Sequence, residues 1–261
     1  MAALEAPQSP WAFSDKERVR RLVALPGVRR ESLSKLASAR VAIVGVGGLG
    51  NASALYLAAQ GVGHLTLVDG DAVAQHNLGR QILFRPEDVG RLKVEAAAEA
   101  LRRLRPELGV STVAAPLGES NWRAVLANHD LVLDGLDQGL PRDLLNRWAV
   151  ETGRPVVFAG AIGYEAQVFV VQGGRPCLHC LFGSVAEVAE DCAVTGVLGP
   201  VVGMAGLVQA QEALKLLLQV GRPLVGRLWL WDAFSGSTRI LEVPARPDCP
   251  VCGAAPTAHK G

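Results

Sequence analysis

The stretch VAIVGVGGLG, residues 41–50, sets the organisation of this chain. Residues 41–44 are all apolar, and three of them are β-branched, which is typical of a strand buried on both faces of a sheet. An apolar helical pattern then runs over residues 49–60. The order predicts a strand, a tight turn and a helix. Four glycines form the turn: Gly45, Gly47, Gly48 and Gly50.

A glycine turn in this position can bind a phosphate. Gly45 permits the tight turn, Gly47 lets the backbone approach a phosphate, and Gly50 lets helix and strand pack closely. The free N–H groups at the helix start then face the anion, aided by the helix dipole. A second strand, 64–68, ends in Asp69, about 20 residues past the glycines, where a ribose hydroxyl needs an acceptor. The pattern indicates a nucleotide site, and its alternative is a purely structural turn.

Composition and charge set limits on partners and compartment. The chain has 26 basic and 25 acidic residues, which gives no electrostatic case for a nucleic-acid or membrane partner. The first ten residues lack the basic start and apolar core of a secretory signal. The apolar run 197–220 contains charged and amide side chains, so it predicts a buried helix rather than a membrane span. We expect a cytoplasmic protein, where cysteines bind metal or react more often than they form disulfides.

The remaining pattern predicts a Rossmann-like, doubly wound, mostly parallel α/β sheet with an antiparallel C-terminal extension. An alternating segment at 166–171 begins the antiparallel part, and residues 173–198 read as a long loop. The expected helices cover 91–105, 122–128, 140–151 and 201–220. The expected strands cover 110–114, 131–133 and 155–159, with a hairpin at 227–231 and 238–243.

Two CxxC pairs predict a structural zinc site within this fold. They are Cys177-Leu-His-Cys180 and Cys249-Pro-Val-Cys252, and four thiolates in two such pairs match a closed tetrahedral zinc ion. The second pair must return across the domain to meet the first. A redox pair or disulfides are the alternatives. His179 is expected to be a bystander, because four cysteines already complete the coordination.

Several motifs follow one another in a set order. They are GVGGLGN (45–51), DGDAVAQHNLGRQ (69–81), Lys93, DGLDQ (134–138) with Arg142 and Asn146, the CxxC pairs, and DCAVTGVLGP (191–200). Together they resemble the MoeB/ThiF family, relatives of the ubiquitin-activating enzymes, over about residues 16–253. The resemblance implies that Mg-ATP is used to adenylate the C-terminal Gly-Gly carboxylate of a ubiquitin-fold sulfur carrier, releasing pyrophosphate.

The resemblance also implies roles for individual residues. A carboxylate that attacks a phosphate meets charge repulsion, so the site needs backbone donors, fixed cations and magnesium. The implied ligands are Arg80 and Lys93 for phosphate, Asp137 for magnesium, Asp69 for ribose, and Asn77 and Gln81 for phosphate or neighbouring backbone. Taken alone, Arg80 and Lys93 could be surface charges, and Asp134 and Asp137 a helix cap and a turn residue. Gln138 stands where the family usually has asparagine. Arg142 and Asn146 either brace the magnesium loop or cap a helix.

Two further residues are implied to act at other stages. Cys192, the fifth cysteine, is either a small buried group or a nucleophile, and ThiF-like relatives have a cysteine here that joins the activated carrier. Arg18 and Arg21 resemble the family's Arg-x-x-Arg element. Its second arginine reaches the ATP site of the partner subunit, which implies a homodimer.

The expected organisation is an N-terminal helical arm (1–40), an adenylating Rossmann-like domain with zinc knuckles (41–253) and a flexible tail (254–261). Partners would be a carrier ending in Gly-Gly, of thiamin, molybdopterin or tRNA-thiolation type, and a sulfurtransferase or cysteine desulfurase as sulfur donor. One alternative is an NAD(P)-dependent oxidoreductase, although neither Tyr56 nor Tyr164 is followed by lysine four residues later. The others are an enzyme that activates another carboxylate and a zinc-stabilised interaction module.

Overall fold

A computed structural model describes residues 17–136, 139–183 and 196–253. Within these residues the strands form one eight-stranded sheet in the order β3-β2-β1-β4-β5-β6-β7-β8. The first five strands of that order are parallel, and the last three pair antiparallel. The strands are β1 Arg40–Val44, β2 His64–Val68, β3 Gly109–Val113, β4 Leu131–Asp134, β5 Val156–Ile162, β6 Glu165–Val171, β7 Arg227–Asp232 and β8 Ser237–Glu242. The predicted fold class is confirmed.

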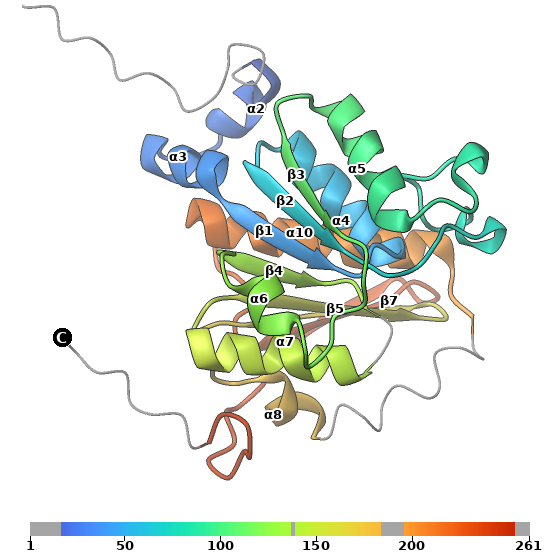
Figure 1. Ribbon diagram of the computed structural model, residues 1–261. Coiled ribbons are helices and arrows are strands. Elements are labelled where there is room, and N and C mark those ends of the chain that lie inside the picture. The colour runs from blue at the N-terminus through green and yellow to red at the C-terminus, as the bar shows by residue number, and fades with distance from the viewer. Residues whose placement is uncertain (1–16, 137–138, 184–195, 254–261) are drawn as a thin grey trace, which may run out of the picture.

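Helices cover both faces of the sheet (Figure 1). Over the described residues they are α2 Arg20–Val23, α3 Arg30–Ser38, α4 Gly48–Ala59, α5 Lys93–Leu104, α6 Trp122–Leu126, α7 Gly139–Thr152, α8 Leu178–Phe182 and α10 Gly199–Leu218, with short 3-10 turns at Gln75–Asn77 and Pro86–Asp88. The prediction of a loop throughout 173–198 is wrong for α8. This single short turn follows directly on Cys177, so the knuckle geometry and not a long apolar period specifies it.

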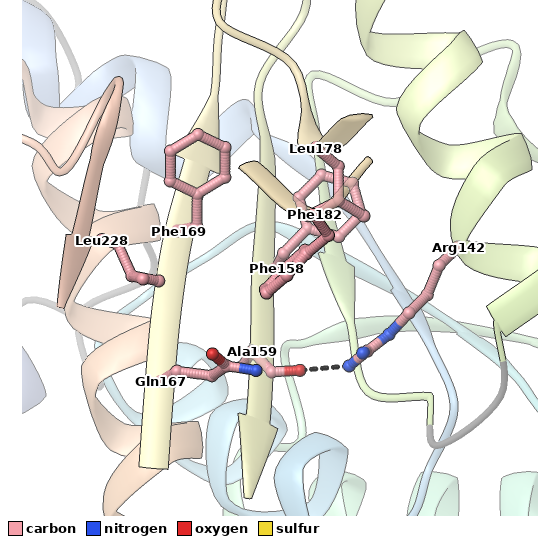
Figure 2. A pocket seen from close by; sticks show the side chains of 8 residues that line it. All are labelled: Arg142, Phe158, Ala159, Gln167, Phe169, Leu178, Phe182 and Leu228. Carbon is pink, nitrogen blue, oxygen red and sulfur yellow. Dashed lines mark hydrogen bonds between the residues drawn. The ribbon is translucent and has the colours of Figure 1, made fainter. Parts of the chain in front are cut away.

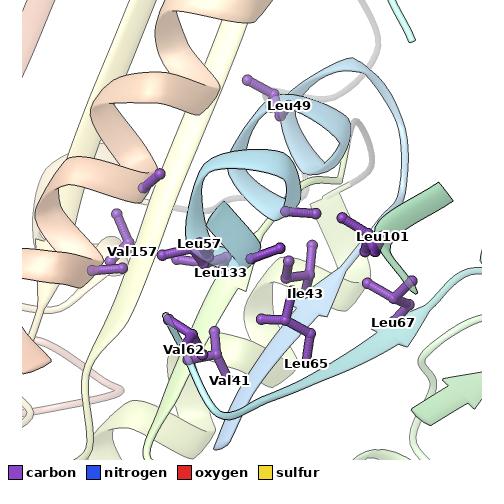
Figure 3. Packing of buried hydrophobic residues seen from close by; sticks show 14 of the residues in the cluster. Val41, Ile43, Leu49, Leu57, Val62, Leu65, Leu67, Leu101, Leu133 and Val157 are labelled. Carbon is purple, nitrogen blue, oxygen red and sulfur yellow. The ribbon is translucent and has the colours of Figure 1, made fainter. Parts of the chain in front are cut away.

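The sheet is sandwiched between two apolar layers because β1 is buried on both faces. Val41 and Ile43 pack on one side with Leu57 of α4 (Figure 3). Ala42 and Val44 belong to a second cluster on the other side, together with residues of α6 and α7. Side chains alternate across a strand, so a near-continuous apolar run is required where helices cover both faces.

The long helix α10 lies on one face of the sheet. By length and composition it is the one helix of the described residues that could cross a membrane. It packs instead against α4, β5 and β6, and a Cβ on Gly206 would lie 2.6 Å from the carbonyl oxygen of Leu49. The prediction of a buried helix over this apolar run is confirmed.

Candidate active site and metal centre

The glycine turn lies at the carboxyl end of β1, between β2 and β4. Gly45 has φ of +90°, a conformation that favours glycine, and its N–H donates to the carbonyl oxygen of Val68 at 2.8 Å. On the other side the N–H of Gly135 donates to the carbonyl oxygen of Val44 at 2.7 Å. The chain leaves β1 for β2 on one side and returns to β4 on the other. This is the switch point where open α/β sheets bind ligands.

The other glycines of the turn allow close approach of neighbouring segments. A Cβ on Gly50 would overlap with the carbonyl group of Gly45, so only glycine lets α4 start so near the strand. A Cβ on Gly48 would overlap with Val202 of α10 and lie 3.2 Å from the carbonyl oxygen of Arg80. The same position on Gly47 meets nothing closer than 3.8 Å. The turn is therefore tightly enclosed at Gly45, Gly48 and Gly50, and open at Gly47.

Asp69 holds the turn through both carboxylate oxygens. Its Oδ2 accepts a hydrogen bond from the N–H of Val46 at 2.8 Å, and its Oδ1 accepts one from the N–H of Asp71 at 2.8 Å. Asp69 follows β2 directly and is partly exposed. The side chain thus connects the glycine turn to the loop after β2. Its predicted contact with a ribose hydroxyl stays a prediction.

Lys93 starts α5 and is tied to the same loop. Its Nζ lies 2.7 Å from Oδ2 of Asp71, and its backbone N–H donates to the carbonyl oxygen of Asp71 at 2.9 Å. The lysine side chain is only 9% exposed, whereas that of Asp71 is 74% exposed. A nearly buried ammonium group therefore faces a carboxylate that is free to move into solvent. This arrangement brings Lys93, Asp71 and Asp69 to the same edge of the sheet.

The polar loop between β2 and α5 closes the far side of the turn. Arg80 donates through its guanidinium to the carbonyl oxygen of His76 at 3.2 Å. Asn77 accepts from the N–H of Ala74 at 2.9 Å, so its side chain contacts neighbouring backbone, one of its two expected partners. Gln81 is 2% exposed, and its Oε1 is buried with no hydrogen-bond partner among the described residues.

Arg142 braces the loop after β4, which is one of the two roles expected for it. Its Nε lies 2.8 Å from Oδ2 of the fully buried Asp134, and its guanidinium donates to the carbonyl oxygens of Leu136 and Ala159. Asp134 also accepts from the N–H of Leu136 at 3.1 Å, which makes it a turn residue. Asp137 and Gln138 lie outside the described residues.

An apolar pocket adjoins this brace (Figure 2). Arg142 enters it from α7, while Leu178 and Phe182 of α8 lie over Phe158 of β5. The other lining residues come from β5, β6 and β7: Ala159, Gln167, Phe169 and Leu228. The pocket therefore connects the loop after β4 with the antiparallel strands and the cysteine knuckle.

The four predicted zinc cysteines form one cluster. Their Sγ atoms all lie within 4.8 Å of one another, with 3.6 Å between Cys177 and Cys249 and 3.4 Å between Cys180 and Cys252. Thiolates around a tetrahedral zinc ion at 2.3 Å stand about 3.8 Å apart, so the cluster fits this metal. His179 is not part of it.

The environment of the cluster favours thiolates at some positions and thiols at others. Burial raises the pKa of Cys177. Burial also acts to raise that of Cys249, but the backbone N–H groups of Cys252 and Val251 outweigh it and lower its pKa to about 7. The N–H of Arg246 donates to Sγ of Cys180 at 3.5 Å. A bound zinc ion would displace the remaining protons, so metal affinity must fall at low pH.

Two side chains outside the CxxC motifs join the two knuckles to the domain. Nε of Arg175 donates to the carbonyl oxygen of Cys252 at 2.6 Å. The buried Oδ1 of Asn146, on α7, accepts from the N–H of Leu178 at 2.8 Å. Asn146 therefore braces the knuckle rather than the loop after β4. The second CxxC pair returns across the domain, as its spacing predicted.

Comparison with known proteins settles the family. The model of the ThiF family matches residues 19–251, nearly the whole chain. The chain belongs to the ThiF family.

Two relatives of this ThiF-family chain are similar over almost their full lengths. The chain is 41% identical to the molybdopterin-synthase adenylyltransferase of Escherichia coli (strain K12), covering 92% of this chain and 98% of that one. It is 38% identical to the sulfur carrier protein adenylyltransferase of Thermus thermophilus, covering 96% and 95%. Among solved structures, E. coli MccB with MccA-N7isoASN superposes with a TM-score of 0.81 at 22% identity, over 95% of this chain and 77% of that one. The last similarity concerns the fold alone.

Sequence reasoning gave no individual role to two residues of the candidate site. Asp71, which stands among the polar residues of the loop after β2, pairs with Lys93. Asn51 is fully buried and hydrogen-bonded to the glycine turn. The signal there was a polar amide in the first turn of an otherwise apolar helix.

The remaining predicted residues do not join the group around the glycine turn. Arg21 lies exposed on α2, beside α3, at the end of the sheet where β1 begins (Figure 1). The 20 residues of α10 span about 30 Å. The glycine turn contacts the first turn of this helix, whereas the N-terminal arm, at Gly27, lies near Val220, just past the last turn. The arm at Gly27 and the glycine turn therefore lie at opposite ends of α10. Cys192 and the tail 254–261 lie outside the described residues.

Proposed function

We propose that this ThiF-family chain is an ATP-dependent adenylyltransferase that activates the C-terminal Gly-Gly carboxylate of a ubiquitin-fold sulfur-carrier protein and releases pyrophosphate. Two close relatives carry the name adenylyltransferase, one of them for a sulfur carrier protein. The observation that carries the proposal is one continuous set of contacts at the switch point. It runs from the glycine turn through Asp69 and Asp71 to Lys93.

The phosphates of ATP fit the start of α4. The N–H groups of a helix start and the open backbone at Gly47 suit an anion. Lys93 would exchange its exposed partner Asp71 for a phosphate oxygen, and Arg80 would bind the phosphates from the loop against Gly48. The buried Oε1 of Gln81, which has no partner within residues 17–136, 139–183 and 196–253, fits a hydroxyl or amino donor of the nucleotide. Asp69 would accept from the ribose.

The reaction needs charge stabilisation more than proton transfer. A carboxylate oxygen of the carrier attacks the α-phosphorus, the bond between that phosphorus and the bridging oxygen breaks, and pyrophosphate leaves with the electron pair. The attack brings two anions together, so Lys93, Arg80 and the backbone donors act by neutralising charge. Asp137 would bind magnesium, which when present adds further neutralisation.

The zinc ion would be structural. All four thiolates belong to one closed cluster, which leaves no open position for a substrate or water. Its role would be to hold the C-terminal knuckle, which Arg175 contacts at Cys252, against the first knuckle, which Asn146 joins to α7. A stable knuckle then fixes the apolar pocket beside Arg142.

The remaining roles extend the same proposal. The protein would be a cytoplasmic homodimer in which Arg21 reaches the partner's phosphates. The thiolate of Cys192 would attack the acyl carbon of the carrier adenylate, break its bond to the phosphate oxygen and release AMP, which leaves the carrier on the enzyme as a thioester. A separate sulfurtransferase or cysteine desulfurase would supply sulfur. An enzyme–carrier adduct that thiol reagents release, and that is lost in Cys192→Ala, would support the covalent step. Its absence from the wild type would restrict the enzyme to adenylylation.

Exchange of labelled pyrophosphate into ATP tests the proposed function directly. We expect exchange with a carrier ending in Gly-Gly, and none with the same carrier lacking its last glycine. A free peptide ending in Gly-Gly tests the activation of other carboxylates. Calorimetry with ATP and with NAD distinguishes an oxidoreductase. Tight NAD binding without ATP binding, or exchange that ignores the carrier, would overturn the proposal.

A further inference from the structure

Asn51 makes three hydrogen bonds at the centre of the proposed site. Its Nδ2 donates to the carbonyl oxygens of Val46 at 2.8 Å and Gly47 at 2.9 Å. Its Oδ1 accepts from the N–H of Leu83 at 2.8 Å. The side chain is fully buried, and its bonds to Val46 and Leu83 are made away from water, whereas the bond to Gly47 is partly buried. One amide therefore joins the glycine turn to the loop that carries Arg80.

The two donated bonds determine which way the turn presents its N–H groups. In a trans peptide the C=O and the N–H of the same plane point in opposite directions. The Asn51 side chain draws the carbonyl of Val46 inward, and it shares the carbonyl of Gly47 with its own backbone N–H, which donates to that oxygen at 2.9 Å. The N–H groups of Gly47 and Gly48 therefore point to the opposite side, away from the amide. Asp69 holds the N–H of Val46 at the same time. The peptide donors at the helix start are thus fixed before any ligand arrives.

The hydrogen bond that Asn51 accepts from Leu83 holds the Arg80 loop against the glycine turn. Leu83 follows Arg80 and Gln81 closely, and the carbonyl of Arg80 already lies against Gly48. Only a side chain that donates and accepts at once, at this reach, can make all three bonds. An aspartate keeps the acceptor for Leu83 but loses both donated bonds, and an alanine loses all three.

We infer that Asn51 is a positioning residue that holds the glycine turn and the Arg80 loop in the arrangement that binds the triphosphate of ATP. The inference rests on the proposed function, because it assigns phosphate to these N–H groups. Asn51 acts through the backbone of the turn and the loop, without a contact to the nucleotide.

The test compares Asn51→Ala and Asn51→Asp with the matched control Ser53→Ala. Ser53 is equally buried in the same helix, but its hydroxyl bonds only to the carbonyl oxygen of Gly50 within the first turn. We expect Asn51→Ala to weaken ATP binding about tenfold in calorimetry and to raise the KM for ATP, because two of the lost bonds are buried. The KM for the carrier should stay unchanged. Amide hydrogen exchange at Leu83 should speed up in Asn51→Ala and stay slow in Asn51→Asp.

The outcomes separate this inference from the proposed function. A wild type that binds ATP, with an Asn51→Ala that binds it equally well, overturns the inference alone. Equal weakening in Ser53→Ala also overturns it, because general destabilisation then explains the loss. A wild type that binds no ATP overturns the proposed function and this inference together. If Asn51→Ala does not fold, Asn51→Asp decides: it must weaken ATP binding while Leu83 remains protected.

Discussion

Gly45 and Gly135 approach each other so closely that neither has room for a side chain. A Cβ on Gly45 would lie 2.5 Å from the carbonyl oxygen of Gly135, and a Cβ on Gly135 would overlap with the carbonyl oxygen of Gly45. The two residues follow β1 and β4, neighbouring strands of the sheet. Their contact brings the loop that leads to Asp137 against the glycine turn.

Gly135→Ala adds only one methyl group, but it should impair ATP binding strongly. The new methyl group must push the turn and the loop apart, an overpacking that costs about 1–3 kcal/mol and lowers Tm by several degrees. Gly118→Ala is the matched control, because a Cβ there meets nothing within 4 Å. Calorimetry with ATP and thermal melting of both variants measure the effect. Normal ATP binding by Gly135→Ala would contradict the proposed position of the triphosphate.

Lys93→Ala should lose carrier-dependent pyrophosphate exchange while the fold survives. Deleting one preorganised charge donor costs on the order of 10²–10³ in rate at comparable sites. Lys35→Ala, which removes an exposed lysine of α3, should exchange at the wild-type rate. Exchange by Lys93→Ala within about threefold of the wild type would show that the ammonium group serves only to pair with Asp71.

The cysteine cluster should contain one zinc ion per chain. Cys249→Ser should lose the metal and melt roughly 10 °C lower, because a structural zinc site contributes folding free energy directly. His179→Ala is the control within the same knuckle, and it should retain both metal and melting temperature. Elemental analysis of protein purified without chelator provides the measurement. Absence of zinc from the wild type would leave the cluster as four thiols.

Acid should destabilise the fold through His129. Burial lowers its pKa from the ordinary value of 6.5, and its Nε2 lies 2.7 Å from the hydroxyl of Thr66 in a 4% exposed site. A basic group with a lowered folded-state pKa binds protons more readily when unfolded. Stability is therefore fully present above the unfolded pKa and decreases as the pH falls below about 6.5, by at most about 1.4 kcal/mol per pH unit.

The variant His129→Gln should remove part of this pH dependence. Urea unfolding at about pH 7.5 and about pH 5.5 gives the free energy of unfolding at both ends of the window. We expect a smaller difference between the two values in His129→Gln than in the wild type. The exposed His76→Gln serves as control. Equal pH dependence in all three proteins would assign the loss of stability in acid to other groups.

Arg21 should act on the partner's active site. Its arm packs at Gly27 against Val220, just past the end of α10, whereas the glycine turn lies at the start of that 20-residue helix. Mixed dimers of Arg21→Ala and Lys93→Ala chains place one intact site in each heterodimer. Random mixing should then restore about a quarter of the wild-type exchange rate. Exchange no higher than that of either parent would refute the arrangement in trans.

The sequence by itself determined the local elements and the type of fold. The apolar run of β1, the four glycines and the periodic start of α4 specify a β–α–β unit through contacts between neighbouring residues. The spacing within the two CxxC pairs likewise indicates a zinc site. Such features follow from periods of two and 3.6 residues and from the conformational freedom of glycine, which are properties of short segments.

Only the tertiary structure decided which distant groups meet at the site. The ion pair of Lys93 with Asp71, the bonds of Asn51 to Val46 and Leu83, and the closeness of Gly45 to Gly135 depend on strand order. The short helix α8 also escaped prediction, because the knuckle that forms it needs cysteines 72 residues away. These contacts join segments that are remote in the chain, and burial of the whole sheet, rather than any local preference, brings them together.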